Sequence, residues 1–262
     1  MTASAGQPPP EADEPEADQP KPAIDTEPGA TPADARAGSV ASEGESDRAT
    51  GTGGGEARRS PMEGIEIDRA RREVRVAARV ALNAGILEFL AVADGGRVHE
   101  SVFSSQVRPS ILHMSLLMIG LEPCGPVGDD VKWYERARNS PARLKVEVEC
   151  ELDGETMRAP VSELLHNREA EDGIAPDTWV FAGSHFISRD GKQQYAGDLQ
   201  DAIVSIVPFK ASVVQYATQT SNPYADEKFG LALGPHEIGP VGTQVTLVLS
   251  PWGRASGEPA GN

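Results

Sequence analysis

Side chains that could build a hydrophobic core are almost missing from the first sixty residues of this chain. Residues 1–60 hold 8 of the 21 prolines and 8 of the 27 glycines but only three large apolar residues, and all 13 aromatic residues lie beyond residue 88. Such a segment cannot offset the cost of ordering its backbone, which is about 1–2 kcal/mol per residue. The sequence therefore predicts a long disordered acidic arm over residues 1–60, a single folded domain over residues 61–252 and a flexible tail over residues 253–262.

The net charge of −16 is shared by both parts of the chain. Residues 1–60 carry 12 acidic and 5 basic side chains, whereas residues 61–262 carry 28 acidic and 19 basic ones. Binding to nucleic acid needs clustered Lys and Arg, and an acidic surface repels polyanions and anionic membranes. The composition thus excludes nucleic acid as a partner, and it leaves an unknown small molecule or protein as the expected partner.

Cysteine content and hydropathy restrict the class of protein further. Two cysteines are too few for a four-cysteine zinc site or an iron–sulfur cluster, and no cofactor is expected. No run approaches the ~20 apolar residues of a transmembrane helix, so no transmembrane span is predicted. The chain begins without a basic segment followed by an apolar one, and the sequence therefore predicts no signal peptide.

Apolar and polar residues alternate in the segment that follows the arm. Between Ile65 and Leu82 the apolar residues recur at period two with charged residues between them, which is typical of a half-buried antiparallel hairpin. The clearest alternation covers residues 144–152, where Leu, Val and Cys alternate with Lys and Glu. Both segments predict strands with one face in the core and one face in water.

Turn residues indicate further strands. Residues 86–92 and 98–103 are predicted to pair as a second hairpin, because Asp94-Gly95-Gly96 between them suits a tight turn. Asp190-Gly191 is predicted to close another hairpin. The remaining strands are expected at residues 179–181, 186–188, 203–207 and 243–249.

Two short segments have the punctuation of helices. Pro109 precedes the apolar run ILHMSLLMI and Gly120 ends it, which predicts a largely buried helix. Ser162 is suited to cap a second, short helix that would run through Leu165 and His166. The fold class expected from these elements is α+β, with a mainly antiparallel β-sheet and two helices.

Several separated segments of the chain resemble the YdjY domain family of bacteria. They are LEFLAVADGGRVHESV, the RPS…LLMIGLEP helix, WVFAGSHF, the Gly197-Asp198 pair followed by IVSIVPF, and IGPVGTQVTLVLSP. The resemblance extends over about residues 65–251. It implies no reaction, because none is established for the family. Many members look exported or lipid-anchored, so the resemblance favours the cell envelope as the location.

His99, Glu100 and Ser101 are the most chemically suggestive cluster, because they offer a base, a carboxylate and a hydroxyl at consecutive positions. On a strand, however, Glu100 would point away from the other two, and a catalytic relay could not form from these three residues alone. The alternative is structural. His99 and Ser101 would then form hydrogen bonds within or beside the sheet, and Glu100 would pair with a basic neighbour such as Arg108.

Candidate metal and ligand sites are less distinct. His99, Glu100 and His113 could supply metal ligands, but their spacing is not diagnostic, and a structural role for each histidine is the alternative. Asp198 follows a glycine before a buried strand and is a candidate binding residue that could instead cap backbone amides. Trp179 could line a pocket, although an aromatic residue at this position in a strand also suits the core.

The sequence therefore favours a non-catalytic binding or structural module of the bacterial cell envelope. The alternative is a hydrolase-like or metal-dependent enzyme that uses His99, Glu100 and His113.

Overall fold

The structure of the chain is a computed structural model that describes residues 62–128, 131–152, 154–220, 223–226, 230–234 and 238–253. The arm predicted over residues 1–60 lies outside the described residues, as does the tail from residue 254 onward. The described residues include nearly all of the domain that the hydrophobic pattern predicts.

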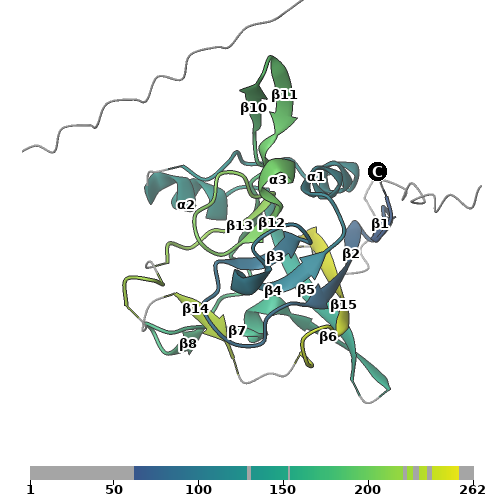
Figure 1. Cartoon of the computed structure of the whole chain (residues 1–262), viewed down its shortest axis with the longest axis vertical. Coiled ribbons are helices and arrows are strands. Elements are labelled where there is room, and N and C mark those ends of the chain that lie inside the picture. The colour runs from purple at the N-terminus through teal and green to yellow at the C-terminus, as the bar shows by residue number, and fades with distance from the viewer. Residues whose placement is uncertain are drawn as a thin grey trace, which may run out of the picture. The chain divides into compact units, whose positions relative to one another are not determined.

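Eight strands of the domain pair side by side into a closed, mixed β-barrel (Figure 1). The ring runs β2, β15, β5, β9, β13, β12, β3 and β4, and β4 pairs again with β2. Neighbours in the ring are antiparallel except for β12–β13 and β3–β4, which are parallel. The strands are β2 (Glu73–Val80), β3 (Phe89–Ala93), β4 (Ser101–Ser105), β5 (Arg143–Leu152), β9 (Trp179–Phe181), β12 (Ala202–Ser205), β13 (Val214–Tyr216) and β15 (Gln244–Pro251).

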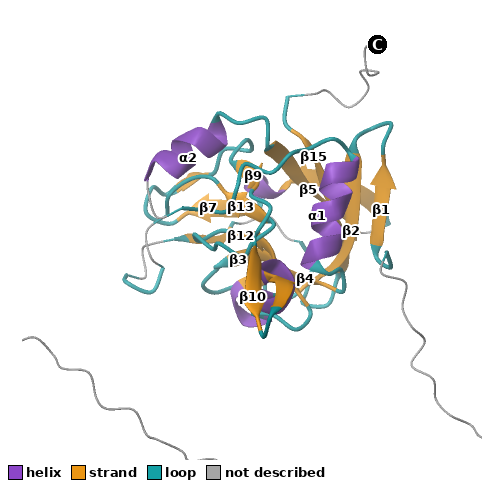
Figure 2. Cartoon of the chain, turned by 90° about the horizontal axis from the view of Figure 1, so that it is seen from above, coloured by secondary structure: helices purple, strands orange, loops and turns teal. Residues whose placement is uncertain are grey.

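Shorter elements extend and cover the barrel. β1 pairs with β2 and β6 pairs with β5, while β10 and β11 form a hairpin that projects beyond α3 (Figure 1). Helix α1 packs beside β2, and α2 packs beside β9 (Figure 2). The remaining strands are β1 (Ile65–Asp68), β6 (Glu155–Pro160), β7 (Leu165–Asn167), β8 (Asp172–Gly173), β10 (Phe186–Arg189), β11 (Lys192–Tyr195) and β14 (Leu231–Leu233). The helices are α1 (Pro109–Met118), α2 (Val131–Arg138) and α3 (Ala196–Gln200), with 3-10 turns η1 (Val98–Glu100) and η2 (Val161–Glu163).

The predicted alternation along β5 is confirmed. Leu144, Val146 and Val148 are buried in the main core cluster together with Val76 of β2 and Leu247 of β15. Burial of such side chains contributes about 1.5–3 kcal/mol each relative to exposure, and it fixes which face of each strand points inward. The mainly β character of the domain is therefore confirmed, whereas its closure into a barrel goes beyond what the sequence predicts.

Charged side chains on the outer face of β2, β5 and β6 form a connected set of ion pairs, here called the outer-face ion-pair network. Arg158 Nη2 lies 3.0 Å from Glu73 Oε1 and 2.7 Å from Glu147 Oε2, and Arg158 Nη1 lies 3.3 Å from Glu149 Oε1. Arg75 binds the same Glu149 carboxylate. These ion pairs therefore connect strands that are far apart in sequence.

The second hairpin predicted from the sequence is wrong, because β3 and β4 are parallel neighbours. The chain turns after β3 and returns through η1 to begin β4 beside the start of β3. The glycines serve a close approach instead of a hairpin turn, since a Cβ at Gly96 would lie 2.8 Å from Asp201 Cβ. A glycine-rich turn suits both connections, so the local sequence could not distinguish them.

The helix predictions need three corrections. The helix predicted after Ser162 is a single 3-10 turn, η2, and residues 165–167 continue as strand β7. Three α-helices are present in the described part of the chain instead of two, because α2 was missed and α3 contains the turn expected at Asp198. α1 forms as predicted but is less buried than expected, since its outer side exposes Met114, Leu117 and Met118.

Candidate functional site

The His99-Glu100-Ser101 segment lies where η1 passes into β4. Ser101 is fully buried, and its hydroxyl donates to the Arg97 carbonyl at 2.7 Å, which closes the turn. His99, in contrast, is exposed to solvent over 74% of its side chain, and its Nε2 lies 3.7 Å from Glu100 Oε1. The proposed structural role is therefore supported for Ser101, whereas the exposed His99 makes a polar contact only with Glu100 among the described residues.

Glu100, the acidic residue of this segment, is largely enclosed, with 18% of its side chain exposed. Oε1 accepts a hydrogen bond from the Tyr224 hydroxyl, and this bond raises the pKa of Tyr224 to about 12. Oε2 is buried and has no hydrogen-bond partner among the described residues. The expected pairing with Arg108 is wrong, because Arg108 lies 2.6 Å from Asp198 instead.

Glu88 is a neighbour of Glu100 that the sequence did not indicate. Its backbone N–H donates to the Glu100 carbonyl at 3.0 Å, and burial together with the Glu100 carboxylate raises the pKa of Glu88. The parallel register pairs Phe89 with Ser101, so the two glutamates that precede these residues lie side by side. An antiparallel hairpin would have separated them, which is why the predicted topology concealed this pair.

Arg97 partly compensates the two carboxyl groups. Its Nη1 lies 3.0 Å from Glu88 Oε2, and its guanidinium lies over the rings of Phe89 and Phe209 at 4.5 and 4.8 Å. One guanidinium faces two carboxyl groups, so the pair retains an excess of negative charge unless one glutamate binds a proton. Like charges held together in this way reduce the stability of the fold.

We predict that Glu100→Gln stabilises the domain at neutral pH by about 1 kcal/mol, because it removes the like charge beside Glu88. A carboxyl pKa that is raised in the folded state contributes stability below the ordinary value of about 4.3, and this contribution is lost as the pH rises through the raised pKa. The gain of the variant should therefore grow between about pH 4 and pH 7 in urea denaturation.

The control for this series is Glu122→Gln, a change at an exposed glutamate outside the pair. It should leave the free energy of unfolding within about 0.5 kcal/mol of the parent at every pH. A Glu100→Gln variant that is less stable than the parent at pH 7 would show that the carboxylate supports the fold.

His113 lies on α1 and has different neighbours. Its Nδ1 is 2.9 Å from the Gly183 carbonyl oxygen and 2.8 Å from the Tyr195 hydroxyl, and burial lowers its pKa. These contacts join α1 to the segment before β10 and to the end of β11. Within the described segments, no three His, Cys, Asp or Glu side chains are placed to hold a metal ion together.

Asp198 connects α3 to the first turn of α1. Its Oδ1 accepts from the Ser110 backbone N–H at 2.8 Å, and its Oδ2 accepts from the Ser110 hydroxyl at 2.7 Å and from Arg108 Nη2 at 2.6 Å. Arg108, the N-cap residue of α1, provides no side-chain cap. Asp198 therefore supplies the acceptor that a helix N-terminus needs, from another part of the chain.

Trp179, the other candidate binding residue, lies in the core. Its side chain is fully buried, and its ring centroid lies 5.3 Å from that of Tyr216. Its indole Nε1 has no hydrogen-bond partner in the part of the chain that the structure describes. This placement matches the core alternative that the strand pattern left open for Trp179.

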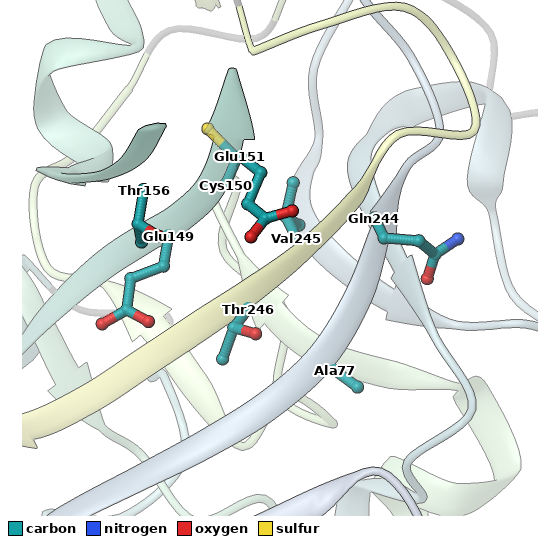
Figure 3. Close-up of a pocket in the computed structure, with 8 residues that line it drawn as sticks. All are labelled: Ala77, Glu149, Cys150, Glu151, Thr156, Gln244, Val245 and Thr246. Atoms are coloured by element: carbon teal, nitrogen blue, oxygen red, sulfur yellow. The ribbon is translucent and has the colours of Figure 1, made fainter. Parts of the chain in front are cut away.

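A hollow of about 370 Å³ lies on the outside of the sheet, above β2, β15, β5 and β6 (Figure 3). It is called here the outer-face hollow. Thr246 of β15 lies between Ala77 of β2 and Glu149 of β5, and the Glu151 side chain reaches from β5 toward β15 (Figure 3). The lining residues are Ala77, Glu149, Cys150, Glu151, Thr156, Gln244, Val245 and Thr246.

The YdjY domain model matches residues 65–250. The chain belongs to the YdjY domain family. This match confirms the resemblance found in the separated sequence segments, and YdjY is a domain of unknown function. No curated protein and no solved structure matches this chain.

Two of the segments that resemble the YdjY family meet in the contacts of Asp198. Arg108 and Ser110 belong to the RPS segment, and Asp198 belongs to the Gly197-Asp198 pair. The polar residues of this YdjY domain that meet here hold α1 against α3. No helix among the described residues of this YdjY domain is long and apolar enough to cross a membrane.

Proposed function

We propose that this YdjY domain is a non-catalytic binding module of the bacterial cell envelope, and that it binds its ligand in the outer-face hollow. The observation that carries the proposal is the set of uncommitted polar side chains there. Glu151, Thr156 and Thr246 have no hydrogen bond or ion pair to the described part of the chain, and Gln244 bonds only to the Gly242 carbonyl at 3.3 Å.

The neighbouring outer face is different in this respect. Arg75 and Arg158 engage Glu73, Glu147 and Glu149 in the outer-face ion-pair network. A polar group that is already bonded within the protein must break that bond before it binds a ligand. Glu151, Thr156 and Thr246 of the hollow have no such bond to break in the described part of the chain, and the sheet holds their backbone in place.

Three of the groups that could act as catalysts are engaged within the protein, although among the described residues the exposed His99 and the Glu100 Oε2 atom have no hydrogen-bond partner. Ser101 bonds to Arg97, His113 bonds to Gly183 and Tyr195, and Asp198 caps α1. Nucleophilic catalysis by a hydroxyl needs a free base within hydrogen-bonding reach. These contacts support a non-catalytic module because they use the same atoms to hold the fold.

The compartment in the proposal rests on resemblance, because many YdjY members look exported or lipid-anchored. Fractionation of bacteria that produce the chain naturally tests it. The protein should be found with the envelope fractions when detected with an antibody against the domain. Recovery with the cytoplasmic marker enzymes would remove the envelope from the proposal and leave the binding role unaffected.

We expect small polar fragments to shift the backbone NMR signals of Glu151, Gln244 and Thr246 when neutral, cationic and anionic fragments are screened against the full chain. Ala77→Gln places a longer side chain in the lining of the hollow and should weaken these shifts at least about fivefold. Ala170→Gln is the matched control at another exposed alanine and should leave them unchanged. Shifts that Ala77→Gln does not weaken would contradict binding in the hollow.

The second candidate function is a hydrolase-like enzyme, which the Glu88–Glu100 pair favours. The Glu88 carboxyl, whose pKa is raised by burial and by Glu100, could act as a general acid beside a second carboxylate that acts as a general base. His99 lies 3.7 Å from Glu100, but His113 bonds to Gly183 and Tyr195 instead. In the fragment screen, shifts concentrated at η1 instead of the hollow would favour this alternative.

A further inference from the structure

We propose that the ligand of the outer-face hollow is a neutral carbohydrate, a mono- or disaccharide bound through its hydroxyl groups. This inference rests on the proposed function, because it names the class of ligand for the same site. It is carried by the kind, the spacing and the charge of the side chains that line the hollow.

The kind of side chain fits a polyhydroxylated ligand. A sugar hydroxyl donates one hydrogen bond and accepts others. The Glu151 carboxylate accepts, and the Thr156 and Thr246 hydroxyls both donate and accept. The carbonyl oxygen of the Gln244 amide remains available as an acceptor, because the hydrogen bond to the Gly242 carbonyl is donated by Nε2. The hollow thus offers both the donors and the acceptors that neighbouring hydroxyl groups of a sugar need.

The spacing of these groups is set by the sheet. Glu151 lies directly opposite Thr156 in the β5–β6 register, and Thr246 lies opposite both Glu149 and Ala77. Directly opposed residues have Cβ atoms about 4.5–5.5 Å apart, so several hydroxyls of one sugar can be reached at once. The short Ala77 and Thr246 side chains leave a hollow of about 370 Å³, within the usual size of small-molecule sites.

The charge of the hollow favours a neutral ligand over an anion or a simple cation. Arg75 and Arg158 compensate Glu149, which leaves Glu151 as the uncompensated carboxylate of the lining. Its negative charge opposes phosphates and other anions. A single exposed ion pair contributes little to binding, so Glu151 alone does not select a cation. An uncharged ligand can form hydrogen bonds with several lining side chains, whereas a simple cation would interact mainly with Glu151.

The test is an NMR titration of the full chain with maltose, glucosamine and glucose 6-phosphate, each to about 50 mM to detect millimolar binding. Maltose should produce saturable shifts at Glu151, Gln244 and Thr246, whereas glucose 6-phosphate should produce none there. Thr246→Val removes one hydroxyl at similar shape and should weaken maltose binding at least about threefold.

Glu151→Gln separates a sugar site from a cation site. It removes the charge but keeps an acceptor, so maltose affinity should remain within about threefold, whereas a cation would lose its partner. Glu122→Gln, at an exposed glutamate outside the sheet, is the matched control and should have no effect. Thermal melts of each variant check that the fold is intact.

Each outcome bears on a different statement. Shifts at the hollow with glucosamine but not with maltose would overturn the neutral-sugar inference and leave the binding function standing. The same holds if none of the three probes binds while other fragments still shift the hollow. If both the probes and the fragments leave the hollow unchanged, the inference and the proposed function fail together.

Discussion

Val148→Asp should lower the free energy of unfolding by about 3–5 kcal/mol, enough to unfold much of a typical domain population. Val148 is 3% exposed at the middle of β5, opposite Leu247 on one side and Ala159 on the other. A carboxylate there would lie in the apolar core with no partner, and either its burial or its protonation is costly. Circular dichroism during thermal and urea denaturation measures the loss.

The control is Val241→Asp, which places the same carboxylate at a valine that is 58% exposed. This change should alter the free energy of unfolding by less than about 0.5 kcal/mol. Similar losses in the two variants would mean that the inward face of β5 is wrongly assigned.

The sequence predicts the face of each residue on β5 better than its lateral contacts. Alternation places Glu149 on the outer face, where a substitution such as Glu149→Lys would be nearly neutral if the side chain had no partner. In the structure Glu149 is bound by Arg75 and Arg158, and this contact with Arg75 lowers the pKa of Glu149. A period of two residues specifies whether a side chain faces the core or water. It cannot indicate a partner such as Arg75, which lies 74 residues away from Glu149 in the sequence.

The closure of the barrel has the same non-local origin. β15, the last strand, lies between β2 and β5, and β4 closes the ring by pairing Val80 with Phe103. Hairpins can be predicted from their turns because the pairing is local, whereas these pairings depend on the packing of distant segments. The β1–β2, β5–β6 and β10–β11 hairpins could be predicted for this reason.

The candidate sites also depend on contacts between segments that are distant in sequence. The sequence indicates Glu100 as a candidate because His99 and Ser101 adjoin it. Its close neighbours in the structure, Glu88 and Tyr224, come from other segments. The lining of the outer-face hollow comes from four strands, and on β5 and β15 its polar residues alternate with core residues, so no local motif marks it. A period-two pattern gives each strand a polar face without indicating which polar groups remain unbonded.

Arg158→Met should lower the free energy of unfolding by about 2–3 kcal/mol at pH 7. Arg158 contacts three carboxylates, and the side chains of Glu73, Glu147 and Glu149 are only 6%, 11% and 15% exposed. Without the guanidinium these enclosed negative charges repel one another, although methionine still covers the same apolar surface.

The pH dependence separates this cause from lost packing. The pKa of the Glu149 carboxyl is lowered mainly by Arg75 and further by Arg158. The part of the resulting stabilisation that Arg158 supplies is present above the ordinary glutamate value of about 4.3 and is lost as the pH falls through the lowered pKa. The deficit of Arg158→Met should therefore be largest near pH 7 and should shrink below about pH 4, where carboxylates become protonated.

Two further variants complete the test of the network. Arg71→Met, at an arginine whose side chain is 71% exposed, should cost less than about 0.5 kcal/mol. Arg158→Lys keeps one positive charge but cannot reach three carboxylates with a planar fork, so it should recover only part of the loss. A deficit of Arg158→Met that is equal at pH 4 and pH 7 would show that the side chain acts through packing. The outer face of β2, β5 and β6 would then owe its stability to apolar contact instead of to paired charges.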